Sequence, residues 1–249
     1  MGRLLLMMAV AASVATGSRL RAQEEPETGT RLHGHTGSVN AIYGQANPAS
    51  PRETARLMQQ FARCIVSSQP GTTEMYLGEP YDPAEGDDGH PSAAFAKLRR
   101  TMSFCLGMAG GGGGIFASKA EISGYLFRGM LAEAKLMRLR NPSLPAETEV
   151  QKSYEYPWIS KDPQQQVVDE LGACLAAWRP NDAMALLRTP PESPEERAAM
   201  GNLMPLMQAC LRKGAVLKSS PAGLRSAISI GLYHRANDAV PVSNASKAN

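Results

Sequence analysis

Apolar residues recur along this chain at the spacing of buried helix faces, and one run of four such faces occurs twice. The later run begins at Asp162, a helix-capping residue that is followed by Pro163. The apolar positions after it repeat every three or four residues, which is typical of one buried face of an α-helix. They are Val167, Val168, Leu171, Cys174, Leu175 and Trp178. The pattern predicts a helix that ends before Pro180.

The earlier run begins at Ser50 and repeats this helix with the same spacing. Its apolar positions, before a break at Pro70, are Leu57, Met58, Phe61, Cys64 and Ile65. In both runs the proline is followed by a short amphipathic segment, which ends at Leu77 in the first run and at Leu187 in the second. Two successive helices are therefore predicted in each run.

A third and a fourth helix complete each run. The third helix of the later run opens at Ser193 and buries Met200, Leu203, Met207, Cys210 and Leu211. Its counterpart buries Phe95, Leu98, Met102, Cys105 and Leu106. For the fourth helix the predicted caps are Ser118 and Ser220, a register that pairs Gly129 with Gly231.

We therefore interpret the chain as an all-α protein formed by tandem duplication of a four-helix unit. The first repeat is predicted at residues 50–140, a connector at 141–161 and the second repeat at 162–237. Residues 23–49 are polar and lack apolar periodicity, so we expect a flexible arm there. Residues 238–249 are predicted to form a polar tail. Two units of this size can form one domain or two.

The N-terminus has the features of a secretory signal peptide. Arg3 precedes an apolar stretch from Leu4 to Ala15, and small residues then provide a cleavage site after Gly17 or after Ala22. The apolar stretch is too short for a membrane anchor, so no stable membrane insertion is expected once residues 1–22 are removed. We therefore predict a periplasmic or secreted protein.

The basic charge of the chain belongs mostly to this signal peptide. The formal net charge is +3, and a cut after Ala22 removes three arginines and no acidic residue, which brings the charge to 0. A cut after Gly17 leaves +2. Nucleic-acid binding needs a basic surface on the folded part. We therefore expect no nucleic acid as a partner.

Four cysteines lie on predicted buried faces, namely Cys64, Cys105, Cys174 and Cys210. In an exported protein such residues form disulfides, and four cysteines allow three pairings. The duplication favours Cys64 with Cys105 and Cys174 with Cys210, which ties the first helix of each repeat to the third. Each bridge closes a loop of about forty residues and adds roughly 4 kcal/mol of stability in the chain-entropy picture. The alternatives are buried free thiols in a cytosolic protein and, less favoured, a zinc site.

No motif for catalysis, cofactor binding or metal binding is found. The sequence has no Gly-x-Ser-x-Gly elbow and no His-Glu-x-x-His pair. His33 and His35 lie in the polar arm with no further ligand nearby, so we interpret them as linker histidines. The glycine run at 110–114 resembles a phosphate loop in composition alone, because Ser118-Lys119 has the wrong order for one. We therefore predict no catalytic residue, cofactor or metal ligand.

The connector carries the densest aromatic group of the chain, Tyr154, Tyr156 and Trp158. Aromatic side chains on loops often carry recognition, so these residues are a candidate binding strip. The other interpretation, which we favour, is that they pack across the junction between the two repeats.

Several short motifs resemble those of uncharacterised exported proteins of Gram-negative bacteria. They are Leu171–Leu175, Arg179-Pro180, Ala185–Leu187, Cys210 and Gly129–Ala134. The resemblance covers both repeats and departs from the pattern at Gly231–His234, which replaces an Ala-Glu pair. It implies an exported, cysteine-paired helical protein of two repeats, and no particular activity.

The leading hypothesis is a non-enzymatic periplasmic or secreted binding or scaffold module for an unknown protein or small-molecule partner. One alternative is an enzyme with its site in the cleft between the repeats, where polar titratable residues of both repeats would converge. A second alternative is a carrier of an apolar small molecule, because the 13 methionines suit adaptable pockets.

Overall fold

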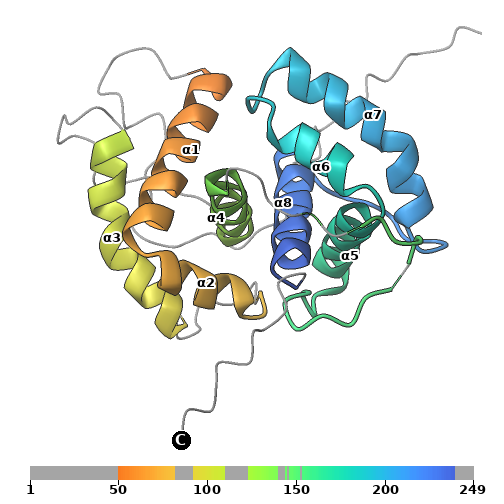
Figure 1. Cartoon of the computed structure of the whole chain (residues 1–249), viewed down its shortest axis with the longest axis horizontal. Helices are drawn as coiled ribbons and strands as arrows, with labels where there is room; N and C mark the ends of the chain where they lie inside the picture. The colour runs from red at the N-terminus through yellow and green to blue at the C-terminus, as the bar shows by residue number, and fades with distance from the viewer. Residues whose placement is uncertain are drawn as a thin grey trace, which may run out of the picture.

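Eight α-helices and no β-strand make up the part of the chain that the structure, a computed structural model, describes (Figure 1). That part comprises residues 50–81, 92–109, 123–139, 144, 146–151 and 153–238. The first half contains α1 (Pro51–Ser68), α2 (Pro70–Gly78), α3 (Ala93–Ala109) and α4 (Gly124–Arg138). The second half contains α5 (Pro163–Trp178), α6 (Pro180–Leu187), α7 (Pro194–Cys210) and α8 (Pro221–Asp238). The all-α prediction is confirmed.

Several expectations concern residues outside this described part. They are the signal peptide at 1–22, the arm at 23–49 with His33 and His35, the glycine run at 110–114, Ser118 and the tail after Asp238.

The predicted capping residues start the helices where a proline stands at the first helical position. The Ser50 hydroxyl accepts a hydrogen bond from the Glu53 backbone N–H at 3.2 Å. Asp162 accepts from two backbone N–H groups at the start of α5, and Ser193 accepts from that of Glu196 at 3.1 Å. Each cap satisfies donors that have no partner inside the helix, so local sequence alone fixes these three starts.

Helices α4 and α8 lie side by side at the centre of the molecule (Figure 1). In the first half α1 and α2 pack against α4, and α3 covers α1 and α2. In the second half α5 and α6 pack against α8, and α7 covers α5 and α6. All residues of α8 from 223 to 233 are buried, as expected for a helix enclosed on every side. One continuous cluster of buried apolar side chains runs through both halves.

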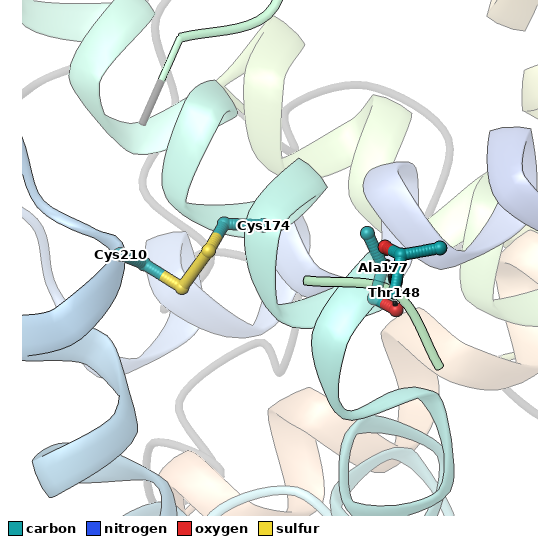
Figure 2. Close-up of a disulfide and its surroundings, with 4 residues drawn as sticks. All are labelled: Thr148, Cys174, Ala177 and Cys210. Carbon is teal, nitrogen blue, oxygen red and sulfur yellow. Dashed lines mark hydrogen bonds between the residues drawn. A yellow bond between two sulfur atoms is a disulfide. The ribbon is translucent and has the colours of Figure 1, made fainter. Parts of the chain in front are cut away.

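A disulfide joins the first and third helices of each half. Cys64 of α1 is bonded to Cys105 of α3, and Cys174 of α5 is bonded to Cys210 of α7 (Figure 2). No cysteine is left free. The predicted pairing within each half is confirmed, and the two halves match helix by helix. Their descent from one duplicated unit stays our interpretation.

The register of the fourth helices differs from the prediction. Helix α4 begins at Gly124, and its cap is Ser123, whose hydroxyl accepts from the Leu126 N–H at 3.4 Å. The Ser220 hydroxyl accepts from the Gly223 N–H at 3.1 Å in the same relation. Aligning these two caps pairs Gly129 with Ser226, so the predicted pairing of Gly129 with Gly231 is wrong by five residues.

Small residues allow the central helices to approach closely. A Cβ placed on Gly129 would lie 2.2 Å from the Cβ of Ser226, at the crossing of α4 and α8. A Cβ on Gly172 of α5 would lie 2.2 Å from the carbonyl oxygen of Ala227 on α8. A larger side chain at either glycine would therefore force the helices apart.

The connector is held against the second half. The backbone N–H of Thr148 donates to the carbonyl of Ala177 at 2.9 Å, near the end of α5 (Figure 2). The Arg235 guanidinium of α8 donates to the carbonyl of Ala146 at 2.8 Å. These two bonds tie the middle of the connector to both α5 and α8.

Candidate functional site

The aromatic residues of the connector form a stack that ends on α8. Ring centroids lie 5.7 Å apart for Tyr154 and Tyr156, 5.6 Å apart for Tyr156 and Trp158, and 4.5 Å apart for Trp158 and His234. Tyr154 and Trp158 are buried, whereas Tyr156 is 39% exposed. Of the candidate binding strip, Tyr156 therefore presents the largest surface, and the other two rings pack inside the molecule.

An open cleft of about 290 Å³ lies between the two halves. One wall is the start of α1 in the first half, and the other is the segment between α6 and α7 in the second half. The lining residues are Ser50, Arg52, Glu53, Arg56, Gln59, Pro190 and Pro191. Its volume is near the lower end of the range for small-molecule sites.

The second wall has a fixed backbone. Helix α6 ends at Leu187, and two consecutive prolines, Pro190 and Pro191, follow it. The next residue, Glu192, has a φ of 58°, which is uncommon for a residue other than glycine. Its N–H donates to Glu196 Oε2 at 2.6 Å. This bond from the first turn of α7 holds Glu192 in the left-handed conformation.

Beneath the cleft lie three buried polar side chains, Glu133, Glu196 and Arg225, and together with half-buried Gln59 of the cleft wall they form what we call the Arg225 cluster. Arg225 Nε donates to Glu133 Oε2, and its Nη2 donates to Glu133 Oε1, both at 2.8 Å. Arg225 Nη1 donates to Glu196 Oε1, also at 2.8 Å. The guanidinium further donates to the carbonyls of Leu187 at 2.9 Å and Thr189 at 3.1 Å.

The Arg225 cluster links the two walls of the cleft through one chain of hydrogen bonds. Gln59, on the first wall, donates from Nε2 to Glu133 Oε1 at 2.7 Å. Glu133 binds Arg225, and Arg225 binds Glu196. Glu196 in turn accepts from Glu192, next to the second wall. Every step in this series is a direct hydrogen bond, and the bonds around Arg225 are buried. The series of hydrogen bonds therefore sets the separation of the two walls.

Burial alone lowers the pKa of the Arg225 guanidinium, but its hydrogen bonds and charge attraction to Glu133 and Glu196 outweigh this and raise the pKa. The arginine therefore stays charged, and two buried carboxylates stay paired with it. Such a cluster adds little net stability when intact, but loss of one member leaves buried charge without a partner.

A second buried arginine, Arg128 of α4, occupies the equivalent place in the first half. It is 1% exposed, and its Nη2 donates to the carbonyls of Leu77 and Glu79 at the end of α2. Its guanidinium carbon lies 5.8 Å from the centre of the Tyr76 ring. Arg128, Tyr125, Asp169 and His234 form what we call the Arg128 cluster, at the opposite end of the α4–α8 contact.

Asp169 is the buried carboxylate of the Arg128 cluster. It accepts from the backbone N–H of Ser160 at 2.8 Å and from Gln165 Nε2 at 3.1 Å. Burial raises its pKa to about 6, although these bonds and the charge of Arg128 oppose the shift. The Tyr125 hydroxyl lies beside this carboxylate without the geometry of a regular hydrogen bond, and burial raises its pKa well above the usual value.

His234 completes the Arg128 cluster. Burial and, to a lesser degree, the positive charge of Arg128 lower its pKa to about 3, while the Leu77 backbone opposes the shift. The imidazole is therefore neutral at physiological pH and stacks on Trp158. Its Nε2 is buried and has no hydrogen-bond partner among the residues that the structure describes.

The carboxylates beneath the cleft are engaged in hydrogen bonds. Each carboxylate oxygen of Glu133 and Glu196 accepts at least one hydrogen bond, so neither group is free to act as a base. Among the described residues, no group of three or more His, Cys, Asp and Glu side chains has the arrangement of a metal site. No helix in this described part is long and apolar enough to span a membrane.

The members of the two clusters are not predictable from the sequence as a group. The only available signal was a charged residue inside a helix that is otherwise apolar, such as Arg225 between Leu224 and Ser226. Glu133 and Arg225 are 92 residues apart, so no local pattern connects them.

Comparisons with protein families, with curated proteins and with solved structures find no match to this chain.

Proposed function

We propose that this protein is a non-enzymatic binding module of an oxidising compartment, the periplasm or the cell exterior, and that its ligand binds in the cleft between α1 and the α6–α7 segment. The observation that carries the proposal is the series of hydrogen bonds from Gln59 through buried Glu133, Arg225 and Glu196 to Glu192, which fixes the two walls before any ligand arrives. A preformed site loses less conformational entropy on binding than a mobile one. The two disulfides favour an oxidising compartment.

The geometry gives less support to the two alternatives. An enzyme between the repeats would need titratable groups from both halves, and the Arg225 cluster does bring such groups together. Its carboxylates, however, are already committed to Arg225, Gln59 and Glu192. A carrier of apolar molecules is disfavoured at this cleft because Arg52, Glu53 and Arg56 line it.

The test is a ligand screen by NMR on the ¹⁵N-labelled, disulfide-bonded protein. We expect ligands from a mixed library of small molecules and short peptides to shift amide signals at residues 50–59 and 189–192. The variant Glu53→Trp should block the cleft and abolish these shifts. The matched control Glu149→Trp adds the same side chain at an exposed connector position outside the cleft, and should leave them unchanged.

Two results would contradict the proposal. One is a set of ligands whose shifts lie elsewhere on the molecule, and the other is binding that Glu53→Trp leaves intact. Turnover of a library compound that requires Arg225 would instead favour an enzyme.

A further inference from the structure

Two exposed arginines, Arg52 and Arg56, line the cleft, and neither guanidinium makes a hydrogen bond or an ion pair within the described part of the chain. Arg52, one helical turn before Arg56, lies near Glu195, whose pKa is lowered chiefly by hydrogen bonds to its own backbone and to Ser193 and, to a lesser degree, by the charge of Arg52. Arg56 is therefore the side chain of the cleft that is most available to an anion.

The opposite wall is apolar and rigid. Pro190 and Pro191 offer ring carbons to the cleft and no backbone N–H donors. Their position is fixed from below, because Arg225 donates to the carbonyl of Thr189, the residue before Pro190. A ligand held by Arg56 within this cleft therefore also has an apolar wall available to it.

We propose that the cleft binds a single carboxylate attached to a compact apolar body, with the carboxylate on Arg56 and the apolar part against Pro190 and Pro191. This inference rests on the proposed function, since it names the ligand class for the same cleft.

The charge of the lining selects a monoanion over a more highly charged group. Arg52 and Arg56 contribute two positive charges and Glu53 one negative charge, which leaves a net charge of +1. Glu195, near Arg52, adds further repulsion for a second negative charge. A phosphate dianion would meet that repulsion, whereas a monocarboxylate balances the lining.

Two sources supply this chemistry, a free carboxylic acid and the C-terminal end of a peptide. Hexanoate serves as the probe for the first source, and N-acetyl-alanyl-leucine with a free carboxyl end serves for the second. Hexanamide and the amidated dipeptide are their neutral controls, because they keep the apolar body and remove the charge.

Each probe is titrated into the ¹⁵N-labelled, disulfide-bonded protein, and the Gln59 side-chain amide and the Glu192 backbone amide are followed. We expect at least one acid to give saturable shifts at both positions, with the matching amide about tenfold weaker or more. Arg56→Gln should weaken acid binding by about the same factor. Arg63→Gln, an exposed arginine of the same helix that does not line the cleft, should leave it unchanged.

Saturable binding of hexanoate alone assigns the site to free acids, and binding of the peptide acid alone assigns it to peptide ends; either supports the inference. Equal binding of acids and amides, or an Arg56→Gln variant that binds as well as the parent, would overturn it while leaving the cleft as a binding site. If no acid shifts these two signals, the inference is wrong. The screen described above then decides separately whether the cleft binds anything else.

Discussion

Arg128 in α4 and Arg225 in α8 hold equivalent places in the two halves, and each donates to the carbonyls that end the second helix of its own half. Arg128 reaches Leu77 and Glu79, and Arg225 reaches Leu187 and Thr189. In both cases a buried guanidinium satisfies carbonyls that have no partner inside their helix. The shared task explains why a buried charged residue stands in the second turn of each central helix.

The neighbours of the two arginines differ. Arg225 is bound by two carboxylates, Glu133 and Glu196, and these contacts raise the pKa of its guanidinium. In the Arg128 cluster the carboxylate of Asp169 is held by neutral donors, and its pKa is about 6. The same position in the scaffold therefore has two different electrostatic environments. The Arg225 cluster holds the walls of an open cleft in place. In the Arg128 cluster the Asp169 carboxyl changes protonation at mildly acidic pH.

Replacement of Arg225 should have the largest effect. Arg225→Met leaves Glu133 and Glu196 buried without their cation, which costs about 3–5 kcal/mol. Urea unfolding of the disulfide-bonded protein measures this loss. The triple variant with Glu133→Leu and Glu196→Leu should recover much of the stability, because it removes the unpaired charges as well. A loss below about 1 kcal/mol for Arg225→Met would contradict the buried ion-pair description.

Arg128→Met should destabilise the protein less, by about 2–3 kcal/mol, since it leaves two carbonyls without a donor. The same urea experiment compares it with Arg225→Met. We assign the larger loss in Arg225→Met to its unpaired carboxylates. A larger loss of unfolding free energy in Arg128→Met than in Arg225→Met would contradict this assignment.

His234 should make the protein less stable in acid. The fold favours its neutral form, so the full stability is present above the unfolded-state pKa of 6.5 and is lost as the pH falls toward about 3. The slope reaches at most about 1.4 kcal/mol per pH unit. We expect His234→Gln to be less stable than the parent at pH 7 and to approach it as the pH falls to 4. A constant difference across this range would contradict the shifted pKa.

Asp169 should act in the opposite direction over a narrower range. Its folded-state pKa is raised, so the stability that it contributes is complete below about pH 4 and is lost as the pH rises to about 6. Asp169→Asn should therefore gain stability relative to the parent between pH 4 and 6, and then stay level. The measurement is the free energy of unfolding of both proteins as a function of pH in the same buffers. A difference between them that does not change from pH 4 to 6 would contradict the raised pKa.

Patterns that span one or two helical turns were sufficient to predict much of the fold. Ser50, Asp162 and Ser193 each sit beside a proline and ahead of an apolar run, and each caps a helix as expected. The disulfide pairing followed from the repetition of these patterns, and the structure confirms it. The caps depend on neighbouring residues in the chain and the disulfide pairing on the repetition of a local pattern, so the sequence alone contains the information for both.

The register of α4 and the buried clusters depend on packing between halves. Ser118 and Ser123 are both credible caps, and local sequence does not choose between them. In the structure Ser123 caps α4, Gly129 lies against Ser226, and the Arg128 side chain reaches the end of α2. Likewise, Asp169 and Tyr125 become neighbours only when α4 and α5 are both in place. Such contacts cannot be predicted from the sequence of a single helix.

The measurement that tests the bracing of the cleft most directly is the exchange of the arginine Nε–H protons with solvent, followed by ¹⁵N NMR near pH 8. Arg225 donates this proton to buried Glu133, so its signal should persist there, as protected as the backbone amides of the core. Exposed Arg63 provides the reference for fast exchange. An Arg225 signal that exchanges as quickly as that of Arg63 would show that the walls of the cleft are not held together from below.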